Sequence, residues 1–269
     1  MSPPRIQPRR FARFSRALPW LLFPLYALAL AGLLRWTGPV AQPASFHDFA
    51  DTRALFGLPN FADVCSNLAI FLPALAGSIF CLRPVAQRAF HSPLERSLAL
   101  LFFLSLIATA LGSTSYHLAP DDSRLLLDRL PIGLAFTLLL AWLCAERIPL
   151  SPGSALALLP WIALGPASVL WWHTGALDGA GDLRPYLLLY AFVFVLTPVL
   201  LLHASPYTPQ AAYWQAYLAF TLGMVCDRLD HPLHAWLGGL ISGHTLKHLL
   251  MGLALFFLIR LLQQRRIQR

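Results

Sequence analysis

Residues 112–131 read GSTSYHLAPDDSRLLLDRLP and join two long apolar segments. Ser113 and His117 are four positions apart, so on a helix their side chains lie on one face, one turn apart. Asp128 opens the next apolar segment after a polar turn, and a helical hairpin would bring it level with them. Polar side chains at such positions are costly in a bilayer and usually serve a function. This hairpin is therefore the first candidate for a site.

A second polar motif lies far along the chain, where residues 242–248 read SGHTLKH. His244 and His248 are again four positions apart, which puts both imidazoles on one helical face. Three histidines, an aspartate and a serine are thus available to one site. A lone histidine near a helix end is usually an interfacial or hydrogen-bonded residue, so a site is favoured only if all five residues lie at one depth.

The composition indicates that the fold lies in a membrane. Of the 269 residues, 57% are hydrophobic and 12% are charged, and the mean hydropathy is +0.61. Soluble domains carry about 25% charged residues, so we predict an all-α integral membrane protein. Spanning helices need about 20 apolar residues, and no alternation of β-barrel type occurs. Eight spans are predicted, near residues 17–36, 64–82, 97–118, 128–145, 152–173, 186–203, 211–226 and 244–262.

The first apolar run follows five arginines and admits two interpretations. A signal peptide would need a cleavage site, and residues 40–44, VAQPA, offer a poor one. The run is long for a signal, and Trp20 and Trp36 bracket it as interfacial anchors do. We therefore predict a retained transmembrane helix.

The distribution of charge predicts the orientation. With a cytoplasmic N-terminus, 13 of the 20 Lys and Arg residues face the cytoplasm: Arg5, Arg9, Arg10, Arg13, Arg16, Arg83, Arg88, Arg96, Arg147, Arg260, Arg265, Arg266 and Arg269. Ten of the 12 acidic residues fall on the other side: Asp48, Asp51, Asp63, Asp121, Asp122, Asp128, Asp178, Asp182, Asp227 and Asp230. The positive-inside rule favours this choice. The arginines form no stripe with stacking aromatics, so we expect no nucleic-acid partner.

The alternating direction of the eight predicted spans provides an independent check on the candidate site. Ser113 and His117 fall at the outer end of the third helix, and Asp128 falls at the outer start of the fourth. His244 and His248 fall at the outer start of the eighth. All five residues therefore lie at similar depth on one side of the membrane, and nothing in the motifs themselves required this.

The chemistry of this set indicates zinc. Three neutral imidazoles with an open fourth position form a common catalytic zinc site, so His117, His244 and His248 are the candidate ligands. Zinc proteases with a His-Glu-x-x-His motif carry a glutamate base where this chain has Thr245. Asp128 is therefore the candidate general base, because a nearby carboxylate can accept a proton and pass it to a leaving group.

The role of Ser113 has two interpretations. It could donate a hydrogen bond to an oxyanion, or it could act as a nucleophile paired with His117. We rank the second lower, because His117 cannot ligate a metal and act as a base through the same nitrogen. A haem site would use histidines in pairs, would leave the aspartate and serine without a role, and is disfavoured.

Four further polar positions have ordinary interpretations. Asp227 and Asp230 close the seventh predicted helix on the outer side, and Asp182 precedes the sixth. Each could form an outer rim of the site, but ion-paired loops are favoured. Lys247 lies within the His-x-x-x-His turn and is expected to extend to the interface, with an anionic head group as the alternative partner.

At these residues the chain resembles the alkaline ceramidases, integral membrane amidases in a superfamily with the progestin and adiponectin receptors. The resemblance covers about residues 45–262 and rests on four ordered motifs: Ser113-x-x-x-His117, Asp128 eleven residues later, His244-x-x-x-His248, and residues 61–67, which end in Ser66-Asn67. It implies a seven-transmembrane-helix ceramidase-like core with a zinc ion held by the three histidines. It also implies that Ser113 and Asp128 lie beside that ion.

The resemblance implies a domain organisation. Residues 1–44 would form a basic tail and an extra N-terminal transmembrane helix, residues 45–262 the catalytic domain, and residues 263–269 a basic cytoplasmic tail. Eukaryotic members of the family also bind calcium near the zinc. The corresponding stretch here offers Asp48, Asp51, Asn60 and Asp63, with fewer carboxylates, which should weaken calcium binding. A Ca²⁺ site is left unassigned.

The resemblance also implies an activity. We expect a zinc-dependent hydrolase of linear amide bonds that cleaves ceramide or a related N-acyl membrane lipid to a fatty acid and a long-chain amine. The alternative is a receptor-like protein or another lipid hydrolase of the same superfamily. No protein partner is inferred. The expected location is a bacterial inner membrane, with both termini cytoplasmic and the site facing the periplasm.

Overall fold

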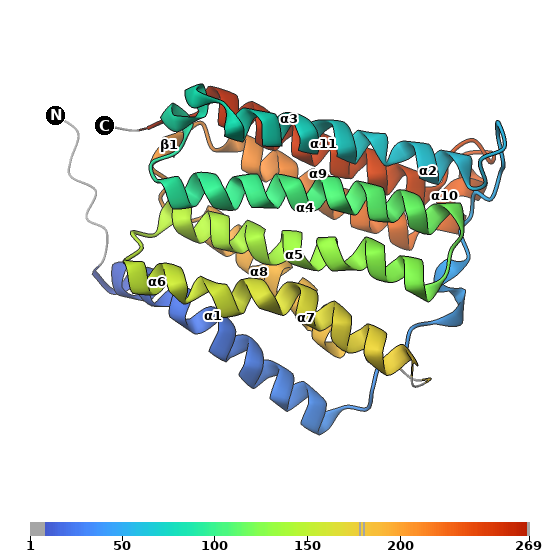
Figure 1. The fold of residues 1–269 in the computed structure, drawn as a ribbon, viewed down its shortest axis with the longest axis horizontal. Helices are drawn as coiled ribbons and strands as arrows, with labels where there is room; N and C mark the ends of the chain where they lie inside the picture. The colour runs from blue at the N-terminus through green and yellow to red at the C-terminus, as the bar shows by residue number, and fades with distance from the viewer. Residues whose placement is uncertain (1–8, 178, 180, 268–269) are drawn as a thin grey trace.

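The computed structural model describes residues 9–177, 179 and 181–267, and shows a bundle of long helices that run back and forth (Figure 1). The long helices are α1 (Arg9–Trp36), α3 (Leu68–Leu82), α4 (Pro93–Leu118), α5 (Asp122–Arg147), α7 (Leu158–Leu177), α8 (Arg184–Leu201), α9 (Ala211–Arg228) and α11 (Gly243–Gln264). Residues 1–8 and 268–269, which belong to the predicted segments 1–44 and 263–269 and include Arg5 and Arg269, lie outside the described residues, as does the predicted outer Asp178.

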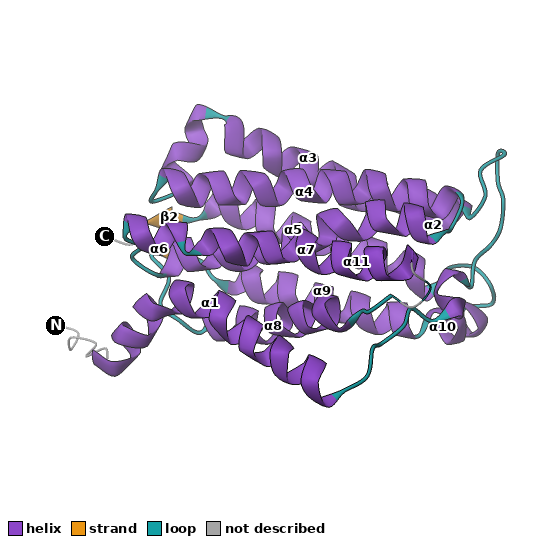
Figure 2. Cartoon of the chain, turned by 60° about the horizontal axis from the view of Figure 1, so that its bottom comes forward, coloured by secondary structure: helices purple, strands orange, loops and turns teal. Residues whose placement is uncertain are grey.

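Short elements connect these helices, and nearly all regular structure is helical (Figure 2). The short helices are α2 (Phe61–Ser66), α6 (Pro152–Leu156), α10 (Asp230–Trp236), η1 (Ala44–His47) and η2 (Pro84–Ala89). Strands β1 (Tyr207–Thr208) and β2 (Arg266–Ile267) pair antiparallel, with Tyr207 opposite Ile267. Residues 37–60 and α10 lie at the end of the bundle opposite the start of α1 and the end of α11 (Figure 1).

Seven segments of the described chain are long and apolar enough to cross a bilayer: Ala17–Trp36, Phe61–Leu82, Pro93–Leu118, Asp122–Arg147, Pro152–Ala176, Arg184–Leu201 and Gly243–Gln264. Large apolar side chains point outward from them, for example Leu72 and Leu111, which are 59% and 60% exposed. In water such exposure would be costly, whereas in lipid it is the normal surface. The chain is therefore an all-α, multi-pass integral membrane protein, as predicted.

The predicted count of eight spans is confirmed for seven of them. The remaining predicted span, residues 211–226, is helical within α9 but is not among the seven apolar segments. Its first two turns include Tyr213, Trp214, Gln215 and Tyr217, which make it less apolar than its neighbours. α9 packs against α11, with Gly223 beside Met251, while Leu218 and Leu222 of α9 are exposed.

Side-chain caps fix where the key helices begin. Asp121 accepts a hydrogen bond from the backbone N–H of Arg124, which starts α5 only three residues after α4 ends. Ser242 accepts from the backbone N–H of Thr245 and starts α11. Such caps satisfy N–H groups that a helix leaves free at its first turn. The caps therefore fix the residue at which α5 and α11 begin, just before Asp128 on α5 and His244 and His248 on α11.

Close backbone contact holds the α4–α5 hairpin together at the level of the first motif. A Cβ atom added to Gly112 would lie 2.1 Å from the carbonyl oxygen of Leu127. Only glycine allows this approach, which is the way small residues bring membrane helices together. Ser113 and Asp128 are the next residues on the two helices, so the contact brings their backbones close.

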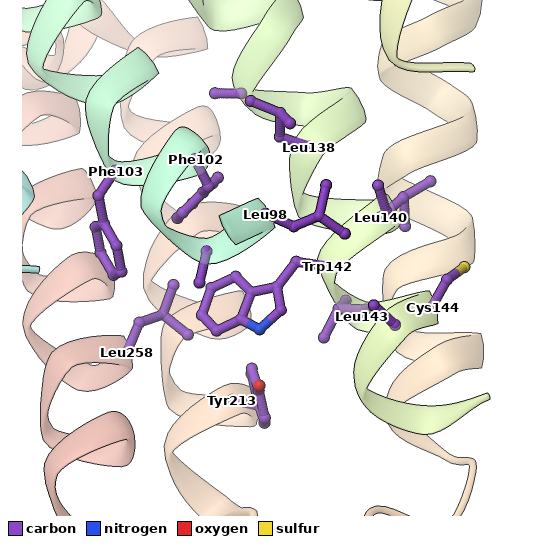
Figure 3. Packing of buried hydrophobic residues seen from close by; sticks show 14 of the residues in the cluster. Leu98, Phe102, Phe103, Leu138, Leu140, Trp142, Leu143, Cys144, Tyr213 and Leu258 are labelled. Atoms are coloured by element: carbon purple, nitrogen blue, oxygen red, sulfur yellow. The ribbon is translucent and has the colours of Figure 1, made fainter. Parts of the chain in front are cut away.

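Aromatic side chains fill the centre of the bundle (Figure 3). Trp142 of α5 is fully buried, and its ring centroid lies 5.7 Å from that of Phe102, 6.2 Å from Phe103 and 6.4 Å from Tyr213. Interlocking shapes of this kind contribute dispersion energy that does not depend on water. They are therefore effective in lipid, where the hydrophobic effect between helices is absent.

A network of buried charges, here called the charge clamp, lies at the end of the bundle where α11 ends. Arg265 donates to Glu95 of α4 at 2.7 Å and to Glu146 of α5 at 3.0 Å, and all three side chains are fully buried. Tyr207 donates to the second oxygen of Glu95 at 2.6 Å, and Arg147 lies 3.2 Å from Glu146. The guanidinium of Arg265 thus joins α4, α5 and the segment after α11.

Removing the central cation should destabilise the fold strongly. In Arg265→Met two carboxylates stay buried without their main partner, and breaking a buried pair in this way costs about 3–5 kcal/mol in the free energy of unfolding. Denaturant unfolding in detergent measures it. Arg260→Met is the matched control, because Arg260 is exposed and lies over the Phe256 ring. Equal stability of the two variants would contradict a structural role for the clamp.

Candidate metal centre

Three imidazoles from two helices meet at the end of the bundle opposite the charge clamp. His117 lies in the last turn of α4, and His244 and His248 lie in the first two turns of α11. All three are buried, and one nitrogen from each lies within 4.8 Å of the other two. The Nε2 atoms of His117 and His244 are 3.1 Å apart. In the described residues no other group of three His, Cys, Asp or Glu side chains converges in this way.

The fit of this donor set to a metal can be tested on its geometry. Zinc–nitrogen bonds of about 2.0–2.1 Å in a tetrahedral site place ligand nitrogens about 3.3 Å apart. The 3.1 Å separation of the two Nε2 atoms is close to that value. Three nitrogen donors are also the set that catalytic zinc sites use, together with a fourth, non-protein ligand. All three nitrogens lie within 4.8 Å of one another, so the residues present could hold a metal ion, and the donor set is compatible with zinc.

Neighbouring residues turn two of these rings so that Nε2 faces the centre. Ser66 donates its hydroxyl proton to the carbonyl of Asp63 at 3.0 Å, so its oxygen accepts from Nδ1 of His248 at 2.7 Å. Nδ1 of His244 donates to Asp227 at 2.9 Å. Both rings then carry their proton on Nδ1, and Nε2 is the acceptor nitrogen, which is the arrangement that hydrogen-bond partners of metal-binding histidines produce.

The third ring is held differently. Nδ1 of His117 is buried and has no hydrogen-bond partner among the described residues. Its backbone carbonyl accepts from the side-chain amide of Asn60 at 2.8 Å. The position of this imidazole is thus fixed through the backbone and by packing, and its described polar contact is the one between Nε2 and His244.

Two aspartates near the end of α9 hold α11 in place. Asp230 accepts from the backbone N–H of His244 at 2.7 Å and, through its other oxygen, from that of Ala50 at 2.9 Å. A Cβ atom on Gly243 would lie 2.2 Å from the carbonyl oxygen of Cys226, so the end of α9 contacts the start of α11 directly. The prediction that Asp227 and Asp230 belong to an ordinary loop is therefore wrong. Both support the histidines.

Lys247 also departs from expectation. Its ammonium nitrogen lies 3.0 Å from Asp227 and 3.1 Å from Nε2 of His244, so it points into the bundle and not toward the interface. The hydrogen bond to Nε2 uses the lone pair that a metal would need. A metal ion at the centre would replace that hydrogen bond, and Lys247 would keep its ion pair with Asp227.

Ser113 and Asp128 lie on facing turns of the α4–α5 hairpin, at the level of the histidines. Ser113 is buried one turn before His117 on α4, and its hydroxyl is close to the Asp128 carboxylate. Nε2 of His117 faces His244. This arrangement is a serine–aspartate pair. It provides no serine–histidine pair of the kind a serine nucleophile needs.

Residues 37–60 form a strap that covers the centre, which the sequence does not indicate. The Phe49 ring lies 4.7 Å from that of His117 and 4.8 Å from that of His244. His47 anchors the strap to the α4–α5 hairpin, with Nδ1 2.9 Å from the Tyr116 hydroxyl and Nε2 3.2 Å from Asp122. Phe49 therefore shields the imidazoles from water.

The residues considered for calcium have separate partners. Asp51 pairs with Arg53 at 2.6 Å, and the hydrogen bonds from Arg53 hold the pKa of the Asp51 carboxyl below its ordinary value. Asp63 is fully buried and accepts from the Thr245 hydroxyl at 2.6 Å. Asn60 faces the His117 carbonyl. These side chains form no cluster of calcium ligands in the described part of the chain.

The loop before α8 has the ordinary structure predicted for it. The Asp182 carboxylate accepts hydrogen bonds from Nε of Arg184 at 3.0 Å and from Nη2 at 2.7 Å. It also accepts from the backbone N–H of Val40, and so ties the strap to this loop.

Comparisons with known proteins do not assign the chain. The sequence matches no model of a protein family and no curated protein. The function is therefore argued from the centre itself and from the resemblance of its motifs.

The aspartate behind His244 should control metal affinity. Losing the hydrogen-bond partner of a metal-binding histidine typically costs about 10- to 100-fold in affinity, so Asp227→Ala should bind zinc about that much more weakly than the unaltered protein. Competition with a chromophoric chelator measures the affinity. Asp122→Ala is the matched control, since Asp122 lies at the same end of the bundle but contacts His47. A similar change in both variants would count against the role of Asp227.

Proposed function

We propose that the chain is a membrane-embedded zinc-dependent amide hydrolase that cleaves ceramide or a related N-acyl lipid. The observation that carries the proposal is the buried histidine triad with two Nε2 atoms turned inward by Asp227 and Ser66. A serine–aspartate pair lies beside it. The resemblance of the ordered motifs to the alkaline ceramidases supports the choice of substrate.

His117, His244 and His248 would hold the ion, which when bound supplies a Lewis acid and an activated water. Asp128 is placed to accept the proton from the attacking water and to return it to the amine nitrogen as the carbon–nitrogen bond breaks. Ser113 can donate a hydrogen bond to the oxygen that becomes negative. The products balance as one fatty acid and one amine for each amide and water consumed.

The surroundings of the site suit a lipid substrate. The helices that carry the site are apolar on the outside, so a lipid can approach sideways from the bilayer. Phe49 and the strap cover the side that faces away from the bundle. Exclusion of water strengthens the electrostatic interactions inside such a site.

The activity is tested by product analysis. The purified protein in lipid nanodiscs should release equal amounts of fatty acid and long-chain amine from ceramide, and membranes with and without the active protein should differ in the same two products. Binding of the lipid without release of either product would favour the receptor-like alternative. Release from another lipid class alone would favour a different hydrolase.

The orientation is part of the proposal: both termini in the cytoplasm of a bacterial cell and the site facing the periplasm. It rests on the 13 of 20 basic residues assigned to the cytoplasmic side. Reporter fusions after Arg269 and in the turn near Asp122 should report opposite compartments. If both fusions report the same compartment, the predicted membrane topology is wrong.

A further inference from the structure

Arg129, the residue after Asp128 on α5, is a buried cation that forms no salt bridge with a carboxylate of the described residues. Its side chain is 6% exposed, and Nη1 donates a hydrogen bond to Oε1 of Gln42 at 2.7 Å. A guanidinium carries five N–H donors and its charge cannot be removed by deprotonation. A buried charge of this kind normally has an anionic partner.

The other buried arginines show what is missing. Within residues 9–177, 179 and 181–267, the other buried arginines are Arg147, Arg184 and Arg265, and each lies within 3.2 Å of a carboxylate. Arg129 forms no ion pair with any described residue. The fold thus supplies a carboxylate to each of the other three and not to Arg129.

Aromatic rings surround Arg129 in place of a carboxylate. Its Cζ atom lies 4.5 Å from the Phe46 ring centroid, 4.5 Å from that of Trp172 and 5.6 Å from that of Tyr186. Such cation–π contacts stabilise the charge but leave the N–H groups at the edge of the guanidinium without acceptors. The rings hold the cation in place and keep its edge available.

Two further donors beside Arg129 also have no acceptor. Because a guanidinium only donates, Oε1 of Gln42 must face it, and Nε2 of Gln42 is then buried without a partner among the described residues. The indole N–H of the fully buried Trp172 likewise has no hydrogen-bond partner among the described residues. Buried donors without an acceptor are rare in folded proteins and call for an explanation. Gln42 and Trp172 each contribute one such donor, and both contact Arg129; the three residues are here called the donor cluster.

We propose that the donor cluster binds the oxyanion of a lipid, and that the hydrolase therefore prefers N-acyl lipids whose amine part carries a carboxylate or phosphate. This rests on the proposed function for the reaction itself. The cluster adjoins the reactive groups, since Asp128 is the preceding residue and Phe49, Tyr116 and Trp172 share one apolar cluster that reaches the histidines. A charged head group would lie against Arg129 while the amide lies at the triad.

A matched pair of lipids tests the preference. N-oleoylglycine and N-oleoylethanolamine differ in a carboxylate against a hydroxymethyl group. Charge-assisted hydrogen bonds should make N-oleoylglycine bind about tenfold to a hundredfold more tightly. Native mass spectrometry of the full-length protein in detergent measures both, and it distinguishes bound substrate from hydrolysed product by mass. Equal binding of the two lipids would overturn the proposal.

Gln42→Glu is the decisive variant, because it gives Arg129 an internal carboxylate and should keep the fold. Its preference for N-oleoylglycine should disappear. Arg129→Gln should lose the preference as well, and Trp172→Phe, which keeps the ring without the N–H, should lose part of it. Arg124→Gln on the same helix is the control and should bind as the unaltered protein does, since Arg124 is 43% exposed and pairs with Asp121. Retention of the preference in Gln42→Glu would overturn the proposal.

Two further measurements distinguish a wrong head-group assignment from a wrong proposed function. If oleate alone binds as tightly as N-oleoylglycine in an Arg129-dependent way, the cluster binds the fatty-acid product and the head-group assignment is overturned. Zinc content and turnover are measured on the same samples. If the protein holds zinc and turns over lipid but shows no preference for the carboxylate, the proposed role of the donor cluster is overturned and the proposed function stands. An Arg129-dependent preference without zinc or turnover supports the cluster and overturns the proposed function.

Discussion

His244→Ala and His248→Ala should each purify almost free of zinc, whereas the unaltered protein should hold about one ion per chain. Each substitution removes one of three nitrogen donors, and the two that remain cannot hold a catalytic ion tightly. Hydrolysis should fall to background in both variants. Elemental analysis after dialysis, with turnover on the same samples, measures the effect.

The matched control for these variants is His231→Ala. His231 lies at the same end of the bundle but is exposed and contacts the Asp48 carbonyl at 3.2 Å. It should keep both zinc and activity. Full zinc in His244→Ala and His248→Ala would remove these residues from the site.

Asp128→Asn should keep zinc and lose turnover by about 10²- to 10⁴-fold, the usual cost of losing a general acid–base. The amide has nearly the shape of the carboxylate and can still accept a hydrogen bond from Ser113, so the α4–α5 hairpin should be undisturbed. Zinc content and single-turnover rates measure the two effects separately. Loss of zinc in this variant would show that Asp128 is a ligand.

Ser113→Ala separates the two roles considered for the serine. An oxyanion donor costs about 10²- to 10³-fold in turnover when removed, whereas a covalent nucleophile would be indispensable. Intact-mass spectrometry during turnover decides between them. An acyl group found on Ser113 would exclude direct attack by water.

Most of the candidate site could be predicted from short local motifs in the sequence. The i, i+4 spacing of His244 and His248 fixes their common face on any helix, and the alternation of spans fixes the end at which they meet His117. Ser113 and Asp128 follow from the same geometry. Each of these predictions depends on helix periodicity and chain direction, which apolar segments show directly.

Contacts between distant polar residues could not be predicted in this way. Asp227 lies in the last turn of α9, whose apolar pattern is weak, and its pairing with His244 depends on how closely α9 packs on α11. Lys247 was expected at the interface because a lysine in a membrane segment usually extends there. Its inward orientation depends on Asp227, so one missed contact produced both errors.

The histidines at the start of α11 and Arg265, the residue directly after its end, complete polar clusters at opposite ends of the bundle, and this fixes the order in which the clusters can form during biosynthesis. The carboxylates of Glu146 and Glu95 precede their partner Arg265 by 119 and 170 residues, and His117 precedes His244 by 127. A ribosome therefore delivers the acidic and imidazole groups of the earlier helices well before the helix that completes both sites. Until α11 inserts, the nascent chain holds two unfinished polar clusters in the membrane, and its arrival completes the two together.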